Sequence, residues 1–122
     1  MELKKRVTCG YRAENLVETA RMVCEGFSLD ALRDMPLEKA RNELTKLKGV
    51  GPKVADCVLL FGLGHTDAFP VDVWVSRLME KWFCVNGSRA FMAKEARRLL
   101  GPHCGLVQQY LFHCARTGKM DV

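Results

Sequence analysis

Residues 47–57 read Leu-Lys-Gly-Val-Gly-Pro-Lys-Val-Ala-Asp-Cys, and this stretch decides the fold. We predict that one helix ends here, that Gly49 and Gly51 turn the backbone with positive φ, and that a second helix begins at once. Pro52 suits the first helical position, where its missing N–H costs nothing. The free N–H groups of the second helix then point outward, as they do in sites that bind phosphate. Lys53 lies beside these groups.

Lys53 has two interpretations. An isolated lysine at such a turn is typically a phosphate contact or a solvated surface cation. A helix N-terminus and an adjoining apolar helix would both favour the neutral amine, however, and a neutral amine can attack a carbon electrophile and form a Schiff base. The turn alone leaves both interpretations open.

The composition indicates one basic globular domain. The chain has 122 residues, of which 48% are hydrophobic and 27% are charged, and this is ordinary for a domain with its own core. The formal net charge of +5 favours a polyanionic partner such as nucleic acid. The N-terminus lacks the apolar run of a signal peptide, and no window is long and apolar enough to cross a membrane.

The cysteines argue against a metal or redox motif. Six cysteines stand at positions 9, 24, 57, 84, 104 and 114, and no pair is spaced C-x-x-C. This spacing indicates neither a zinc ribbon nor a redox motif. No four-cysteine cluster of the kind that holds iron and sulfur is present in the sequence either. We expect most of these residues to be buried, reduced thiols in a reducing compartment.

Apolar residues recur at spacings of three and four along the whole chain, which predicts an all-α fold of about seven helices. The apolar stripe of the first helix is Leu16, Ala20, Val23, Cys24 and Phe27. We expect the helix at 52–63 to be the buried centre, because apolar residues cover most of its circumference. The predicted helices cover residues 11–25, 29–35, 37–47, 52–63, a stretch opened by Pro70-Val71-Asp72, 89–100 and 105–115.

Further sequence signals concern the helix ends and the tail. Ser28 and Ser88 are expected as caps. In the helix that follows Pro70, the last apolar residue expected to face inward is Trp82. In the last helix, the residues expected to face inward include Leu106 and Tyr110. The tail from Arg116 is polar and is expected to be frayed.

Asp72 is the second candidate for chemistry. An aspartate at a helix start is a good N-cap, and it can equally be a carboxylate aimed at developing positive charge. The two roles are compatible, because a capping carboxylate is held in one orientation. Asp72 follows Lys53 by one helix and one loop, so an antiparallel return would bring it back beside the hairpin.

Residues 47–57, followed by Phe69-Pro70-Val71-Asp72-Val73, resemble the helix-hairpin-helix DNA glycosylase superfamily and most of all its 8-oxoguanine DNA glycosylase branch. Gly10-Tyr11-Arg12-Ala13 is similar to the G-Y-R-A segment of that branch, and residues 100–112 are similar to its final helix. The resemblance runs from about Gly10 to Phe112. It implies a helical bundle of the HhH-GPD type and a bifunctional glycosylase/AP lyase that removes oxidised purine during base-excision repair.

The resemblance also implies roles for single residues. Lys53 would be the nucleophile that displaces the damaged base at the sugar C1′ and forms a Schiff base, and Asp72 would stabilise cationic character on the sugar. Cys57 and Phe112 would sandwich the flipped base, while Gln108 would hydrogen-bond its Watson–Crick edge. Without the resemblance, Cys57 and Phe112 are typical core residues and Gln108 is a surface amide.

The remaining implied positions contact DNA or a cation. Tyr11 matches a wedge residue, Arg12 matches a donor to the estranged cytosine, and Gly49-Val50-Gly51 matches the phosphate grip. Trp74 stands where animal members have a histidine near a phosphate. The resemblance also implies a monovalent or divalent cation at the backbone carbonyls of Thr45, Leu47 and Val50. No other cofactor is expected.

The chain also departs from the family pattern. The family carries a sheet domain and further helices ahead of its G-Y-R segment, whereas nine residues precede that segment here. We expect residues 1–122 to form a single, monomeric helical domain without that sheet domain. Its expected partner is double-stranded DNA with oxidised purine opposite cytosine, in a prokaryotic nucleoid or a eukaryotic nucleus. Two alternatives stay open: a DNA-binding module without catalysis, and a glycosylase for another damaged base.

Overall fold

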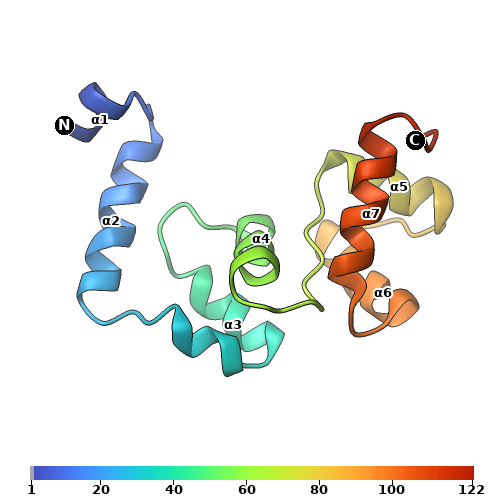
Figure 1. Cartoon of the computed structure of the whole chain (residues 1–122), viewed down its shortest axis with the longest axis horizontal. Coiled ribbons are helices and arrows are strands. Elements are labelled where there is room, and N and C mark those ends of the chain that lie inside the picture. Colours follow the sequence, from blue (N-terminus) through green and yellow to red (C-terminus); the bar gives the residue numbers. More distant parts are fainter. Residues whose placement is uncertain (1) are drawn as a thin grey trace.

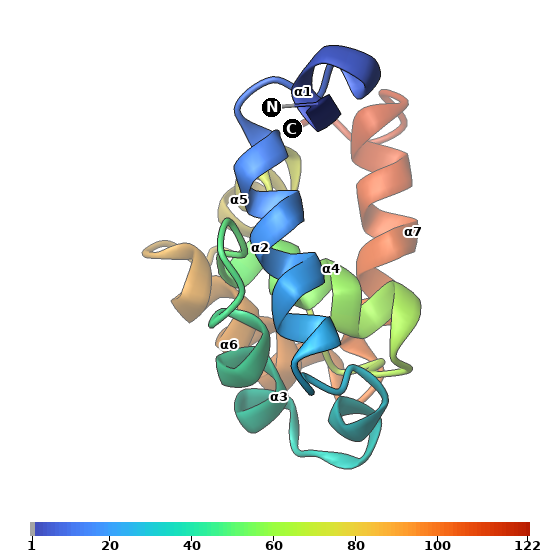
Figure 2. The ribbon, with the colours of Figure 1, turned by 90° about the vertical axis from the view of Figure 1, so that its left-hand side faces the viewer.

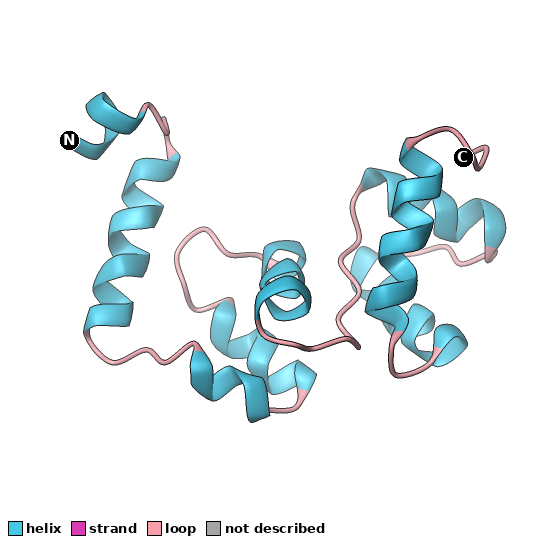
Figure 3. Ribbon diagram, viewed as in Figure 1, coloured by secondary structure: helices cyan, strands magenta, loops and turns pink. Residues whose placement is uncertain are grey.

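The computed structural model describes residues 2–122, and among these it contains seven α-helices, one 3-10 helix and no strand (Figures 1 and 3). This confirms the predicted all-α fold. None of the helices in the described part is long and apolar enough to cross a membrane. The elements are α1 (Glu2–Val7), α2 (Arg12–Cys24), the 3-10 helix η1 (Asp30–Asp34), α3 (Leu37–Leu44), α4 (Pro52–Gly62), α5 (Val73–Trp82), α6 (Arg89–Leu100) and α7 (Cys104–Arg116).

Two hydrophobic clusters form the core. The hairpin cluster joins η1, α3 and α4 around Leu32, Leu44 and Leu59. The C-terminal cluster joins α5, α6 and α7 around Val75, Met79, Met92 and Cys104. The chain passes from one cluster to the other at residues 68–69, because Ala68 packs in the first and Phe69 in the second. Figure 1 shows this segment running from α4 towards the group formed by α5, α6 and α7.

Helix α2 departs from its predicted burial. Ala13 is its single buried residue, and Leu16 is 50% exposed, although Leu16 belongs to the apolar stripe predicted to face a core. In Figures 1 and 2, α2 lies to one side of α3 and α4, and no helix of the described part runs alongside it on the other side. Met22, near its C-terminal end, and Phe27, in the loop that follows, pack against the hairpin cluster.

Local sequence signals placed several helix ends correctly. Asp72 caps α5, and its Oδ1 accepts a hydrogen bond of 2.9 Å from the Val75 N–H. Ser88 caps α6, and its Oγ accepts from the Phe91 N–H at 3.1 Å. The Ser28 Oγ accepts from the Ala31 N–H at the start of η1. Each of these caps satisfies a backbone donor that the helix itself cannot satisfy.

Several residues predicted to face inward are exposed instead. In α4, Val54 and Phe61 are exposed, the latter by 63%, so this helix is not buried all round. Trp82 in α5 and Leu106 and Tyr110 in α7 are exposed as well. Each of these helices has one covered face, and an apolar run wider than that face necessarily leaves some residues in solvent.

The C-terminal tail is docked rather than frayed. The Trp82 Nε1 donates to the Asp121 carbonyl oxygen at 3.2 Å, and the Lys81 Nζ lies 2.8 Å from the Asp121 carboxylate. Met120 and Val122 pack against the C-terminal cluster. The prediction from polarity was wrong because these two apolar residues anchor an otherwise polar stretch.

The cysteines only partly match the expectation of buried thiols. All six are free, and Cys104 is buried, but Cys24 and Cys84 are exposed. Cys24 is exposed because it lies on the uncovered surface of α2. The remaining three are partly buried, namely Cys9, Cys57 and Cys114.

Candidate active site

The turn between α3 and α4 is longer than predicted, because it begins directly after Leu44. Helix α3 ends at Leu44, and the Leu47 N–H then donates to the Leu44 carbonyl at 3.1 Å. The Val50 N–H donates in turn to the Leu47 carbonyl at 3.1 Å. Gly49 has φ +84°, but Gly51 has φ −93° and ψ −177°, which is extended backbone. One glycine of the pair therefore adopts the predicted left-handed conformation, and the prediction for Gly51 was wrong.

Gly49 also allows a close approach of α2. A Cβ at Gly49 would lie 2.4 Å from the Asn15 Nδ2 of α2, which is far inside van der Waals contact. Beside it, the Lys48 Nζ lies 3.7 Å from the Glu14 carboxylate. Figure 2 shows α2 in front of the hairpin. The turn is thus one of the points where α2 meets the hairpin, and a side chain at Gly49 would strike Asn15 there.

The turn leaves backbone donors free. Within residues 2–122, the backbone N–H groups of Gly49, Gly51 and Lys53 donate to no protein acceptor. The Val50 N–H is used inside the turn. The two free glycine N–H groups are on exposed residues. Gly51 is the N-cap of α4, so its N–H and that of Lys53 stand at the positive end of the α4 dipole. This arrangement can hold a phosphate oxygen without reading a base.

Lys53, Cys57 and Asp72 share one neighbourhood. Cys57 lies one helical turn after Lys53, and burial raises the pKa of its thiol. The Lys53 ammonium lowers that pKa, while the Asp56 and Asp72 carboxylates raise it further. The nucleophile candidate and the carboxylate candidate therefore both act electrostatically on Cys57. Lys53 itself is exposed, so the predicted desolvation of its amine by apolar neighbours is absent from this structure.

Gln108 is buried, so it is not the surface amide that its sequence context alone predicts. Its Nε2 donates to the Pro70 carbonyl at 2.8 Å, and its Oε1 accepts from the Gln109 Nε2. The side chain thus ties α7 to the segment that leads into Asp72. Phe112 is partly buried and packs against the C-terminal cluster.

Two aromatic residues that are predicted to contact DNA each have an arginine guanidinium group over their ring. The Arg12 guanidinium lies 4.9 Å from the centroid of the Tyr11 ring, and Tyr11 is 77% exposed just ahead of α2. The Arg77 guanidinium lies 5.7 Å from the centroid of the Trp74 ring in α5. Sequence reasoning missed Arg77, although its spacing of three residues from Trp74 on a helix could have indicated the pair.

The predicted cation site depends on backbone oxygens alone. No cluster of three or more histidine, cysteine or acidic side chains in the described part could hold a metal ion. Of the three carbonyls, that of Leu47 already accepts the Val50 N–H. A carbonyl oxygen has a second lone pair, so this bond leaves the site possible, and the cation stays a prediction.

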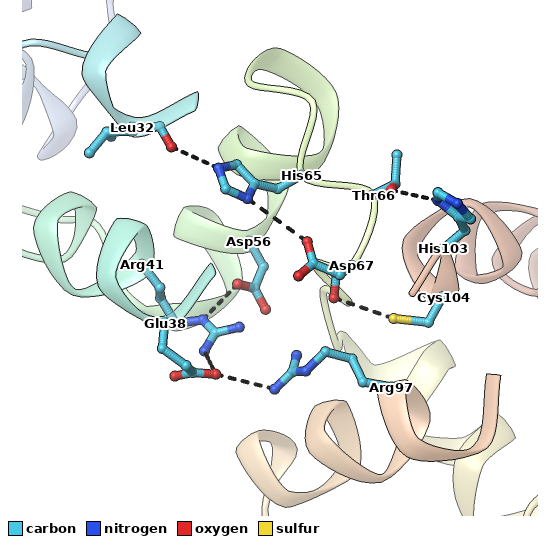
Figure 4. Close-up of polar contacts among 10 residues, drawn as sticks. All are labelled: Leu32, Glu38, Arg41, Asp56, His65, Thr66, Asp67, Arg97, His103 and Cys104. Carbon is cyan, nitrogen blue, oxygen red and sulfur yellow. Dashed lines mark hydrogen bonds and ion pairs between the residues drawn. The ribbon is translucent and has the colours of Figure 1, made fainter. Parts of the chain in front are cut away.

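A charge network that sequence reasoning missed holds the two hairpin helices together (Figure 4). The Arg41 Nε of α3 lies 2.7 Å from the Asp56 carboxylate of α4, and both side chains are largely buried. Arg41 also lies 2.8 Å from Glu38, which in turn lies 3.3 Å from Arg97 of α6. Burial raises the pKa of Asp56, against the effect of Arg41, whereas the hydrogen bond from Arg41 lowers the pKa of Glu38.

Relatives of the chain carry the names of DNA glycosylases. The "Probable N-glycosylase/DNA lyase" of Methanothermobacter thermautotrophicus is 44% identical over 117 residues, covering 92% of this chain and 36% of that protein. The N-glycosylase/DNA lyase of Saccharomyces cerevisiae is 35% identical over 99 residues, covering 72% of this chain and 26% of that protein. No protein-family model matches the chain.

A solved structure shares the fold as well. The Clostridium acetobutylicum 8-oxoguanine glycosylase/lyase, in complex with double-stranded DNA containing cytosine opposite 8-oxoguanine, has a TM-score of 0.84 and 34% identity. The match covers 95% of this chain and 41% of that one. The chain thus spans 36% of the length of the Methanothermobacter relative, 26% of that of the Saccharomyces relative and less than half of the Clostridium chain.

Proposed function

Because this chain belongs to the helix-hairpin-helix DNA glycosylase superfamily, in its 8-oxoguanine DNA glycosylase/AP lyase branch, we propose that it is the catalytic portion of a base-excision-repair enzyme. Its substrate would be double-stranded DNA with 8-oxoguanine opposite cytosine, in a nucleoid or a nucleus. The observation that carries this proposal is the grouping of Lys53, Cys57 and Asp72 beside a hairpin whose backbone donors are free.

The hairpin would hold the damaged strand. The free N–H groups of Gly49 and Gly51 would donate to oxygens of one phosphate, which fixes the strand without reading its sequence. Tyr11 and Arg12 stand together at the start of α2, where they would act as wedge and as donor to the estranged cytosine. Trp74, with the Arg77 guanidinium group against its ring, would make a further contact to the DNA backbone.

Lys53 would carry out the chemistry on that strand. Its neutral amine attacks the sugar C1′ while the glycosidic C–N bond breaks, and the base leaves with the bonding electrons and takes up a proton. The amine loses a proton, the C1′–O4′ bond of the sugar ring breaks while O4′ takes up a proton, and a Schiff base forms. Elimination then removes a proton from C2′, forms a C2′=C3′ double bond and breaks the C3′–O bond. The phosphate leaves, which nicks the strand on the 3′ side, and water finally releases the lysine.

Asp72 would support both stages through its carboxylate. The Val75 N–H holds Oδ1 at 2.9 Å, so the carboxylate keeps one orientation at the start of α5. A fixed negative charge stabilises the cationic character that develops on the sugar. Cys57 and Phe112 would enclose the flipped base. Gln108 would bind its polar edge after exchanging its bond to the Pro70 carbonyl for bonds to the purine.

Borohydride trapping tests the proposal. Sodium borohydride reduces a Schiff base to a stable amine, so the native chain should become cross-linked to a duplex that carries 8-oxoguanine opposite cytosine. Lys53→Gln should give no cross-link, whereas Lys46→Gln should react normally, because Lys46 is exposed and paired with Glu43. No cross-link from the native chain, or an equal one from Lys53→Gln, would sink the lyase assignment.

Asp72→Asn separates the two roles of this carboxylate. Asparagine also caps helices, so the variant should keep the stability of α5. It lacks the negative charge, so single-turnover base release should fall about 10²-fold, as it does when one electrostatic stabiliser is removed from other active sites. Unchanged base release would assign Asp72 to capping alone.

A second candidate function is DNA binding without catalysis. The exposed position of Lys53 beside the free N–H groups of the hairpin favours it, because both features suit a phosphate contact. Such a module should bind duplex DNA in a salt-dependent way and with equal affinity for 8-oxoguanine and guanine. A clear preference for the lesion would exclude it, and a preference for another damaged base would identify a different glycosylase.

A further inference from the structure

A large cavity lies beside Lys53, on the side of α4 that faces α6. Its volume is about 940 Å³, within the usual range of small-molecule sites. Part of its wall is apolar and brings together residues from three parts of the chain, namely Pro52, Phe69, Val71, Ala90 and Ala93. The proposed glycosylase chemistry uses Lys53 and assigns no role to the rest of this space.

The charged part of the cavity wall is mainly cationic. Five cations line it, namely Arg41, Lys53, Arg89, Lys94 and Arg97. The two carboxylates that line it are those of Glu38 and Asp56, and both are already engaged by arginines. Within residues 2–122, Lys53, Arg89 and Lys94 form no ion pair. The cavity therefore favours an anionic ligand.

Two buried guanidinium nitrogens in this wall lack a partner. The Arg41 Nη2 and the Arg97 Nη1 are inaccessible to solvent and make no hydrogen bond. An unsatisfied buried donor on a charged group is costly. Protein atoms cover both nitrogens, so a ligand can reach them only after a neighbouring side chain moves away.

Glu38 marks where such an oxyanion would sit. Its carboxylate lies 2.8 Å from the Arg41 Nη1 and 3.3 Å from the Arg97 Nη2, so it bridges the two guanidinium groups. Figure 4 shows Arg41 and Arg97 reaching it from different helices. The side chain of Glu38 is 68% exposed, so it can swing into solvent and leave both arginines to a ligand.

We propose that this cavity binds the terminal phosphate of a nucleotide. The phosphate replaces the Glu38 carboxylate between Arg41 and Arg97, with which it can form paired, charge-assisted hydrogen bonds. The nucleoside then lies against the exposed apolar residues of the wall, Pro52 and Ala90. Two sources share this chemistry, a free nucleotide and the 5′-phosphate at a strand break, and the second source rests on the proposed lyase function.

Calorimetric titration of the full chain with dGMP tests the site. Binding of dGMP is expected to be saturable, deoxyguanosine is expected to bind at least tenfold more weakly, and inorganic phosphate to compete with dGMP. Equal affinity for dGMP and deoxyguanosine would overturn the assignment of Arg41 and Arg97 to a phosphate.

Three variants check the residues. Arg97→Gln should weaken dGMP binding about tenfold, the usual effect of losing one charge-assisted hydrogen bond. Arg98→Gln is the matched control, because Arg98 is its neighbour on α6, pairs with Glu95 and does not line the cavity. Glu38→Gln should strengthen binding, because it removes the competing carboxylate. Equal losses in the two arginine variants, or weaker binding by Glu38→Gln, would overturn the proposal.

Nicked duplexes with and without a 5′-phosphate at the break identify the source. A preference for the phosphorylated nick that Arg97→Gln abolishes points to the strand end, and dGMP binding without that preference points to the free nucleotide. Absence of both overturns the proposal. Borohydride trapping is a separate measurement. Trapping without phosphate recognition would overturn only the proposed phosphate site, and phosphate recognition without trapping would overturn only the proposed lyase function.

Discussion

Helices α2 and α4 both carry apolar residues at helical spacing but differ in burial. Helix α4 buries Ala55, Leu59 and Leu60 against its neighbours, whereas α2 buries Ala13 alone. The difference lies in the partners, because α3 packs along α4 while α2 meets the hairpin mainly near Asn15 and at its C-terminal end. Apolar periodicity predicts that a helix forms, and the neighbouring elements decide how much of it is buried.

The comparison predicts an uneven distribution of stability. The hairpin combines a hydrophobic cluster with the buried pair of Arg41 and Asp56, and it positions Lys53 at the start of α4. Helix α2, which carries Arg12 and follows Tyr11, has few contacts to hold it. We therefore expect substitutions in α3 and α4 to change the free energy of unfolding strongly and equivalent ones in α2 to change it little.

The largest effect is expected from Arg41→Met. This variant leaves the Asp56 carboxylate buried without its partner, which typically costs about 3–5 kcal/mol of stability. Arg21→Met in α2 is the matched control, because Arg21 pairs with Glu18 in solvent and exposed pairs contribute little. Urea unfolding followed by circular dichroism measures both. A loss of similar size in the two variants would contradict the comparison.

Leu59→Ala should be next in size. Leu59 is fully buried, so its truncation should cost about 2–5 kcal/mol through lost burial and the cavity left behind. Leu16→Ala, on the exposed face of α2, should change the free energy of unfolding by less than about 0.5 kcal/mol. If Leu16→Ala proved as costly, α2 would have to be packed in solution in a way that this structure does not show.

Gly49→Ala tests the close approach of α2 to the hairpin turn. Gly49 and Gly64 both have positive φ, so alanine at either should cost about 1–2 kcal/mol. Gly49→Ala should cost more, because its Cβ would also strike Asn15, whereas nothing lies within 4 Å of a Cβ at Gly64. Adding Asn15→Ala should recover the difference in urea unfolding. Equal costs at the two glycines would show that α2 moves away freely.

Signals confined to a few residues predicted the fold well. Pro52 begins α4, and Asp72 and Ser88 cap α5 and α6, because each of these effects depends on the local backbone. The turn at Gly49 followed from the same local chemistry. The all-α class and the order of the helices could therefore be obtained from the sequence.

Features that depend on distant residues could not be predicted in this way. Asp56 lies on an apolar helix, and nothing near it in the sequence indicates that Arg41, one helix earlier, is its partner. On α7, Gln108 is buried by its bond to the Pro70 carbonyl while Tyr110 is exposed, the reverse of what their polarity suggests. The cavity could not be predicted from local sequence either, because residues of α3, α4, α6 and the segment between α4 and α5 form its wall.

The smallest expected difference between α2 and α4 is in the alkylation rates of their cysteines, which are measured without any substitution. Cys24 on α2 is exposed, whereas Cys57 on α4 is partly buried and its pKa is raised by that burial. The thiolate is the reactive form, so at pH 8 Cys57 should react with iodoacetamide more slowly than Cys24, and its rate should keep rising as the pH is increased further. Mass spectrometry of the labelled peptides gives both rates. In urea the two rates should converge, because unfolding removes the burial of Cys57, and a difference that persisted there would have to come from the local sequence instead of from the fold.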